Sequence, residues 1–149
     1  MLPEPLHVRC MQEFDDIPLP SYASEGAAGM DLYAAVPEPI TLNPGGRAQI
    51  PTGFRISLPL GYEAQVRARS GLALNRGLGM VNAPGTVDSD YRGEIRLIMI
   101  NWSQEPQTIC RGERIAQLVI APVARVRLVP SDSLDETPRG EGGFGHTGI

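Results

Sequence analysis

The stretch YEAQVRAR (residues 62–69) alternates between apolar and polar side chains along its whole length. Tyrosine, alanine and valine occupy one set of alternate positions, while glutamate, glutamine and two arginines occupy the other. Successive side chains of a β-strand point to opposite faces, so this pattern predicts a strand with one buried and one solvated face. The stretches FRISL (54–58) and ARVRL (124–128) alternate in the same way and predict two further strands.

Two longer stretches, EIRLIMINW (94–102) and RIAQLVIAPV (114–123), are more continuously apolar and predict central strands or subunit contacts. Only SGLALNRG (70–77) predicts a helix, over about residues 70–76. Turn sequences separate the predicted strands; they are NPGG (43–46), LPLG (58–61) and NAPG (82–85).

At least eight short strands in 149 residues, with 17 glycines and 14 prolines spread along them, indicate an all-β domain. The two candidate folds are a jelly-roll-like sandwich or barrel and an immunoglobulin-like sandwich. The immunoglobulin spacing of Cys, Trp and Cys is absent, since Trp102 lies eight residues before Cys110 with no suitable partner. We therefore expect a jelly roll, with residues 1–149 forming one domain.

Composition narrows the class of protein. No run of 18 apolar residues is present and the N-terminus lacks a signal-peptide pattern, so we expect a cytoplasmic protein without membrane contact. The net charge of −4 argues against nucleic acid as a partner. All 13 basic residues are arginine, so any anion would be bound by guanidinium groups. Cys10, Cys110, His7 and His146 do not have the spacing of a metal site.

Several stretches carry polar residues that have both a structural and a functional interpretation. Asp88 and Asp90 in GTVDSDYRGEI (85–95) could cap backbone N–H groups of a turn or supply a catalytic acid. Ser70 in RARSGLA (67–73) could cap the short helix, or could bind an anion together with its neighbours. Asp31 and Gln117 sit among apolar residues, where each could satisfy backbone groups or face a site.

The C-terminal stretch RGEGGFGHTGI (139–149) is rich in glycine but contains Arg139 and Phe144. Such segments are commonly flexible termini. We predict that residues 138–149 form a mobile segment, and so flexible a segment would add little to a core, which leaves the presence of its arginine and phenylalanine to be explained.

Together these stretches resemble, in order, the five motifs of the homotrimeric dUTP pyrophosphatases (dUTPases) of bacterial type. The resemblance implies a three-fold trimer with active sites at subunit interfaces and a C-terminal lid. It also implies hydrolysis of dUTP to dUMP and pyrophosphate, which limits uracil incorporation into DNA and supplies dUMP for dTMP synthesis. The matching stretches are GAAGMDLYA (26–34), RSGLA (69–73), NAPGTVDSDYRGEI (82–95), RGERIAQLVI (111–120) and RGEGGFGHTG (139–148).

The resemblance also implies residue roles. Asp88 would activate the water that attacks the α-phosphorus, and Gln117 would hold that water or a phosphate oxygen. Mg²⁺ would arrive with the triphosphate without a direct protein ligand, and Asp31 would act through a water or by positioning residues 69–73. The expected phosphate-binding residues are Arg69, Ser70, Gly71, Gln117, Arg139, Gly145, His146 and Thr147. The expected uracil- and deoxyribose-binding residues are Asn82, Gly85, Thr86, Val87, Asp88, Tyr91 and Phe144.

One position departs from the family pattern and two functions compete with the dUTPase assignment. His146 stands where the family commonly has serine, while Asp90 falls at a variable position and is assigned a structural role. A dCTP deaminase would share the fold but needs a glutamate near the base. A non-catalytic trimer would be expected to have lost the acid, the phosphate-binding arginines or the tail, and all three are retained.

Overall fold

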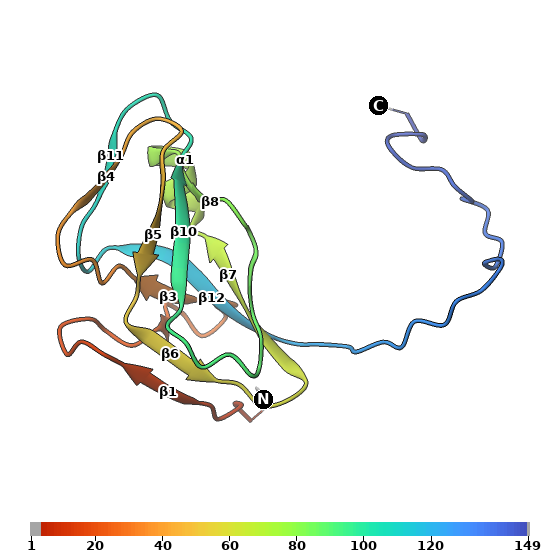
Figure 1. Cartoon of the computed structure of the whole chain (residues 1–149), viewed down its shortest axis with the longest axis horizontal. Coiled ribbons are helices and arrows are strands. Elements are labelled where there is room, and N and C mark those ends of the chain that lie inside the picture. Colours follow the sequence, from red (N-terminus) through yellow and green to blue (C-terminus); the bar gives the residue numbers. More distant parts are fainter. Residues whose placement is uncertain (1–3, 149) are drawn as a thin grey trace.

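The computed structural model describes residues 4–148, and the expected all-β architecture with one short helix is confirmed (Figure 1). The strands are short, and their sheets remain open rather than closing into a barrel. The elements are β1 (Arg9–Gln12), β2 (Ser21–Tyr22), β3 (Met30–Tyr33), β4 (Ile40–Leu42), β5 (Arg47–Pro51), β6 (Phe54–Ser57), β7 (Tyr62–Ala68), α1 (Ser70–Arg76), β8 (Leu78–Met80), β9 (Gly85–Val87), β10 (Arg96–Asn101), β11 (Gln107–Ile109) and β12 (Arg114–Pro122).

The strands form one five-stranded sheet and three smaller ones, with antiparallel pairing throughout. The larger sheet has the order β2-β3-β12-β7-β9, so the apolar stretch 114–123 forms its centre as predicted. Strand β10 lies between β5 and β8, which confirms the central position predicted for residues 94–102. The remaining pairs are β1 with β6 and β4 with β11.

Alternation along β7 determines which of its side chains enter the core. Ala64 and Val66 are buried, while Arg67 on the other face is exposed. Val66 lies opposite Leu118 of β12, which is also fully buried, and both belong to one continuous apolar cluster that spans the sheets. The two-residue period of the sequence therefore predicts the packing of this sheet correctly.

The helix α1 spans Ser70–Arg76, as predicted, and ends at Gly77 in the left-handed conformation (φ 62°). A Cβ on Gly77 would lie 2.8 Å from the backbone nitrogen of Ser103, so both conformation and space favour glycine here. At the other end the N-cap residue is Arg69, and no side chain caps the helix. Ser70 therefore does not have the capping role that was its structural interpretation.

The segment after β12 leaves the body of the molecule (Figure 1). The strand predicted at 124–128 is wrong, because these residues are exposed and belong to no sheet. A strand is stabilised by a hydrogen-bonded neighbour, and the described part of this chain offers none to the segment. Beyond residue 123, the hydrogen bonds of the described tail join only residues of the tail itself.

The predicted lid, 138–149, continues this tail and is described up to Gly148; Ile149 lies outside the described residues, as do residues 1–3 at the other terminus. Within residues 4–148, no helix has the length and apolar character needed to cross a membrane.

Candidate functional site

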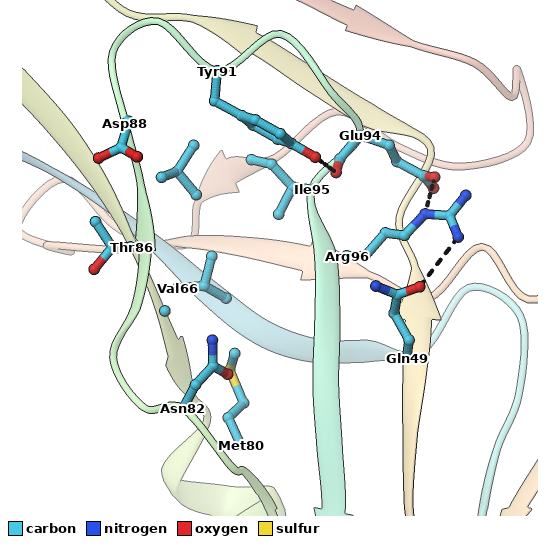
Figure 2. A pocket seen from close by; sticks show the side chains of 12 residues that line it. Gln49, Val66, Met80, Asn82, Thr86, Asp88, Tyr91, Glu94, Ile95 and Arg96 are labelled. Atoms are coloured by element: carbon cyan, nitrogen blue, oxygen red, sulfur yellow. Dashed lines mark hydrogen bonds and ion pairs between the residues drawn. The ribbon is translucent and has the colours of Figure 1, made fainter.

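A pocket of about 210 Å³, the hairpin pocket, lies between the connection 81–95, which contains β9 and corresponds to the predicted hairpin motif, and the start of β10 (Figure 2). Strand β9 pairs with β7, and this pairing brings Val66 into the pocket wall. Ala83 and Pro84, joined by a cis peptide bond, form the turn at the start of the hairpin. The pocket collects six of the seven residues expected to bind uracil and deoxyribose, namely Asn82, Gly85, Thr86, Val87, Asp88 and Tyr91.

The carboxylate of Asp88 lies at the edge of this pocket, next to Thr86 along the same strand edge (Figure 2). Its main-chain oxygen accepts a hydrogen bond from the Tyr91 N–H at 3.1 Å, which closes the turn 88–91. Within residues 4–148, the carboxylates of Asp88 and Asp90 accept no hydrogen bond from a backbone N–H. Backbone capping therefore does not explain either acid, and the exposed Asp88 side chain is free to bind a water or a ligand.

Asp90 does not line this pocket. It is exposed and lines a second depression of about 460 Å³, to which Asp88, Tyr62 and Arg125 also contribute. Of the two acids in the motif, only Asp88 therefore faces the pocket that carries the predicted base-binding residues.

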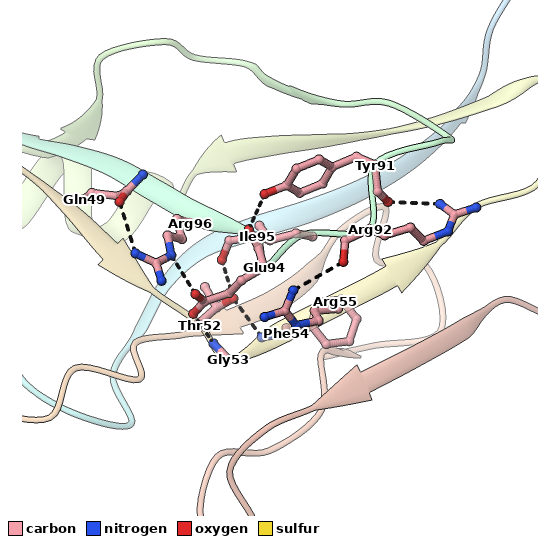
Figure 3. A network of polar contacts seen from close by, with 10 residues as sticks. All are labelled: Gln49, Thr52, Gly53, Phe54, Arg55, Tyr91, Arg92, Glu94, Ile95 and Arg96. Carbon is pink, nitrogen blue, oxygen red and sulfur yellow. Dashed lines mark hydrogen bonds and ion pairs between the residues drawn. The ribbon is translucent and has the colours of Figure 1, made fainter.

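Tyr91 crosses one end of the pocket, and its position depends on the residues that follow it (Figures 2 and 3). Its hydroxyl donates a hydrogen bond to the carbonyl oxygen of Glu94 at 2.8 Å. The Glu94 carboxylate in turn accepts a hydrogen bond from the Gly53 N–H at 2.9 Å and pairs with Arg96 at 2.6 Å. Arg96 also donates to Gln49. The wall behind Tyr91 is thus held by a connected set of polar contacts.

Sequence reasoning missed Gln49, Glu94 and Arg96, which also line the pocket. Glu94 and Arg96 could have been suspected, because they directly follow the hairpin motif. Gln49 comes from β5, whose pairing with β10 places Gln49 near Arg96, and no local signal in the sequence indicates this.

A second polar cluster lies on the five-stranded sheet around Asp31. Its carboxylate is almost fully buried and pairs with Arg69 at 3.1 Å and with Arg114 at 3.2 Å. Arg69 also donates to the carbonyl oxygen of Arg114 at 3.1 Å. Gln117 lies opposite Asp31 in the register of β3 and β12, so its side chain emerges on the same face of the sheet. Asp31 thus fixes two guanidinium groups beside Gln117.

Arg114 is the functional candidate of this cluster that sequence reasoning missed. It lies three residues before Gln117, within the stretch 111–120 that carries the family resemblance. The signal was present, but only the structure shows that Arg114 shares Asp31 with Arg69.

Ser70 and Gly71 begin α1 directly after Arg69, and both are exposed. A Cβ on Gly71 would meet no atom within 4 Å, so the space above this residue is open. The chain therefore places these two predicted phosphate-binding residues at an accessible surface adjoining the Asp31 cluster.

Val66 in the wall of the hairpin pocket and Gln117 beside the Asp31 cluster lie on opposite faces of the five-stranded sheet. In the pairing of β7 with β12, Val66 lies opposite Leu118, whereas Arg67 lies opposite Gln117. Val66 lines the pocket, and successive side chains alternate between faces, so Gln117 points away from Val66.

Thr86 lies opposite Gln65 and so shares the face of Gln117, and Asp88 points the same way as Thr86 (Figure 2). Strand β7 nevertheless separates β9 from β12, and Gln117 does not line the hairpin pocket.

The predicted tail residues contact neither the hairpin pocket nor the Asp31 cluster. Phe144 is fully exposed, and Arg139 donates a hydrogen bond from Nε to the carbonyl oxygen of Gly142 at 2.8 Å, within the tail. His146 packs its ring against Gly142. Gly145 and Thr147 are exposed beside it.

Mg²⁺ requires several oxygen ligands at one point, usually carboxylates and waters. Within residues 4–148, no three side chains of the types His, Cys, Asp and Glu are grouped as a metal site requires. The one nearly buried carboxylate of the candidate site, Asp31, is occupied by two arginines. These residues fit an ion carried by an anionic ligand and its waters better than one bound by the chain alone.

The family model and the individual relatives that match this chain are all dUTPases. The dUTPase family model matches residues 15–148. The deoxyuridine 5'-triphosphate nucleotidohydrolase of Caldanaerobacter subterraneus subsp. tengcongensis is 57% identical over 144 residues, which are 97% of either chain. The protein of the same name from Anaplasma marginale is 56% identical over 132 residues, covering 89% of this chain and 90% of the relative.

Solved structures show the same fold. A point mutant of the dUTPase of Staphylococcus bacteriophage 80alpha, solved with dUpNHpp, superposes with a TM-score of 0.83 at 24% identity, covering 96% of this chain and 99% of the other. A point mutant of the dUTPase of phage phi11 of S. aureus, described as coordinating a structural Mg(II) ion, gives a TM-score of 0.78 at 20% identity, covering 88% and 100%.

Proposed function

The chain belongs to the dUTPase family and hydrolyses dUTP to dUMP and pyrophosphate, and we propose that Asp88 activates the attacking water. The observation that carries this assignment is the free Asp88 carboxylate at the edge of the hairpin pocket. A carboxylate in this position accepts a proton from water as the water oxygen bonds to the α-phosphorus. The bond from that phosphorus to the bridging oxygen breaks at the same time, and pyrophosphate leaves with the electron pair.

The hairpin selects the base and the sugar. The Asn82 amide and the backbone of β9 present fixed donors and acceptors that match the N3–H and O4 groups of uracil. A cytosine would leave these buried partners unpaired, which lowers kcat/KM by about 10⁴-fold in sites built this way. The closeness of Val66 to Gly85, 3.5 Å from a Cβ placed there, limits the space available for a thymine methyl group. The Tyr91 ring lies against the deoxyribose and excludes a 2'-hydroxyl.

The triphosphate is bound by the Asp31 cluster of another copy. Arg69, Arg114 and Gln117 supply donors but do not line the same chain's hairpin pocket, so a complete site requires two chains. Guanidinium groups suit phosphate oxygens because they donate in a bidentate geometry. Ser70 and Gly71 add contacts beside Arg69, where charge develops on the leaving group.

We assign the assembly as a homotrimer with three such sites. Exposed apolar side chains on the tail support an assembly, because Val126, Leu128 and Val129 are 78%, 87% and 79% exposed in the single chain. An exposed apolar surface of this kind suits contact with another copy of the chain.

The tail closes over the bound nucleotide. Its glycines permit it to fold on the ligand, Phe144 stacks on the uracil, and Arg139 binds the outer phosphates. Gly145 and Thr147 add main-chain and hydroxyl donors, and His146 adds an imidazole in place of the usual serine. The full exposure of Phe144 in the free chain supports this role, since an aromatic side chain without contacts gains most from a partner.

Mg²⁺ enters with the triphosphate, where it neutralises charge on the phosphate oxygens. The structural Mg(II) ion of the phage phi11 relative supports magnesium as the metal. Asp31 acts by holding Arg69 and Arg114 rather than by binding the ion directly. The reaction is assigned to the cytoplasm, with neither nucleic acid nor membrane as a partner.

The test is pyrophosphate release from dUTP, dCTP, dTTP and UTP at equal concentrations with Mg²⁺. We expect cleavage of dUTP and at least about 100-fold slower cleavage of the other three. Ammonia release from dCTP, followed in the same samples, would assign the chain to the deaminases instead. A folded trimer that cleaves no dUTP would support a non-catalytic binding protein.

A further inference from the structure

A groove on the far side of the catalytic hairpin carries three arginines without an acidic partner. It has a volume of about 480 Å³ and lies between β1, β6 and the loop 88–94. Among residues 4–148, ion pairs join carboxylates to five other arginines, but none to Arg9, Arg55 or Arg92. In a chain with a net charge of −4, an unpaired basic groove is unexpected and indicates an acidic ligand.

Two of these arginines are held in place by backbone carbonyl groups (Figure 3). Arg55 donates to the carbonyl oxygen of Arg92 at 3.4 Å, and Arg92 donates to that of Ser89 at 2.7 Å. These contacts orient the guanidinium groups without neutralising them. The rest of the groove is partly apolar, with Met11 68% exposed at its edge.

The tail contains a segment of complementary character. Residues 131–137, SDSLDET, include Asp132, Asp135 and Glu136, and all three acids lack an ion pair within the described part of the chain. Leu134 lies among them and is 88% exposed. An acidic segment with one apolar anchor matches a basic groove with an apolar edge.

We propose that residues 131–137 of one copy bind in the Arg9–Arg55–Arg92 groove of a second copy. This inference rests on the trimer proposed above and adds the surface that guides the lid to its site. Arg92 directly follows Tyr91, so the groove and the catalytic pocket share the loop 88–94. Phe144 follows residue 137 by seven residues, which span up to about 23 Å and suffice to reach the other side of a loop.

Cys10 lines the groove and is exposed, which permits a direct test by disulfide trapping. The double variant Cys110→Ser/Ser133→Cys carries one thiol in the groove and one in the acidic segment. After oxidation with diamide, links between Cys10 of one copy and the introduced thiol of the next close a ring of three. We expect a covalent trimer on a non-reducing denaturing gel. Control variants that retain only Cys10, or only the introduced thiol, can form dimers at most.

Charge reversal tests the chemistry of the contact. In the same background, Arg55→Glu and Arg92→Glu should each slow the crosslink by about two- to fivefold, and about 0.5 M salt should slow it in the parent. Arg47→Glu is the matched control, because Arg47 is exposed, has no ion pair among the described residues and lies outside the groove. Equal slowing by all three reversals would overturn the proposal.

The remaining outcomes are also decisive. A crosslinked monomer of altered mobility would show that the segment binds its own chain and would overturn the second-copy assignment. Absence of any link between Cys10 and the introduced thiol, in a protein that is trimeric by light scattering and cleaves dUTP, would overturn this inference alone. A monomer without dUTP cleavage would overturn the proposed function as well.

Discussion

The phenol ring of Tyr91 lies directly against Gly93, so closely that a Cβ on residue 93 would overlap the ring and its hydroxyl. The hydroxyl is meanwhile held by the carbonyl oxygen of Glu94. Glycine at position 93 is therefore what allows Tyr91 to lie across the pocket. Gly93 does not itself line the pocket, but it determines the position of Tyr91, which does.

Gly93→Ala should weaken discrimination between dUTP and UTP, because the added methyl group displaces the Tyr91 ring from the sugar site. We expect the ratio of kcat/KM for the two nucleotides to fall by about ten- to a hundredfold. Tyr91→Phe is the matched control, since it retains the ring and removes only the hydrogen bond to Glu94. A Gly93→Ala enzyme with unchanged discrimination would show that the ring does not select the sugar.

Asp31→Asn should lower kcat/KM for dUTP by about ten- to a hundredfold, because charge-assisted hydrogen bonds to Arg69 and Arg114 are lost. The dUTP to UTP ratio should stay unchanged, since neither Asp31 nor its two arginine partners line the hairpin pocket. Glu113→Gln is the control, because Glu113 forms a comparable ion pair with Arg76 away from the pocket. A changed dUTP to UTP ratio in Asp31→Asn would contradict the independence of the Asp31 cluster and the hairpin pocket.

Gly77→Ala should destabilise the fold more than Gly61→Ala. Both glycines have positive φ, 62° and 90°, so both variants carry the conformational cost. Only at Gly77 would the new Cβ also meet backbone, 2.8 Å from the Ser103 nitrogen, while nothing lies within 4 Å at Gly61. We expect an extra loss of about 1–3 kcal/mol in chemical denaturation at constant protomer concentration. Equal losses of unfolding free energy in the two variants would show that the Ser103 backbone shifts at little cost to make room for the new Cβ.

Stability should depend on pH through Asp16. The hydrogen bond from Arg111 holds the pKa of Asp16 below its usual 3.8, and the opposite charge of Arg111 acts in the same direction. A depressed pKa stabilises the folded state above the unfolded value and loses that effect as pH falls through the folded value. The melting temperatures of the wild type and Asp16→Asn should differ at about pH 5 to 7 and converge below the folded pKa. A difference in melting temperature that persists far below that pKa would not arise from the Asp16–Arg111 ion pair.

The body of this fold could be predicted from sequence because each strand there has its partner within the chain. Alternation placed Val66 in the core and Arg67 on the solvated face, and the turn residues separated the strands correctly. The same alternation at 124–128 gave a wrong strand, because no strand of the same chain pairs with it. A period of two identifies a strand but does not say which chain supplies its neighbour.

The site was predictable residue by residue but not in its arrangement. Motif resemblance identified six of the twelve residues that line the hairpin pocket. It did not identify Arg114, whose link to Arg69 depends on a shared contact with Asp31 across two strands. Nor did it show that β7 separates the strand before Asp88 from the strand that carries Gln117, an arrangement that follows from the order of strands in the sheet. Such relationships depend on pairing between strands distant in sequence.

The most direct test of the proposed mechanism compares dUTP hydrolysis by Asp88→Asn and Asp90→Asn under saturating substrate with Mg²⁺. The two acids share the same loop and differ in that only Asp88 lines the pocket. We predict that Asp88→Asn lowers kcat by about 10²- to 10⁴-fold, while dUTP binding persists and Asp90→Asn stays within about threefold of the wild type. A wild-type kcat in Asp88→Asn, or an equal loss in both variants, would contradict the assignment of Asp88 as the base.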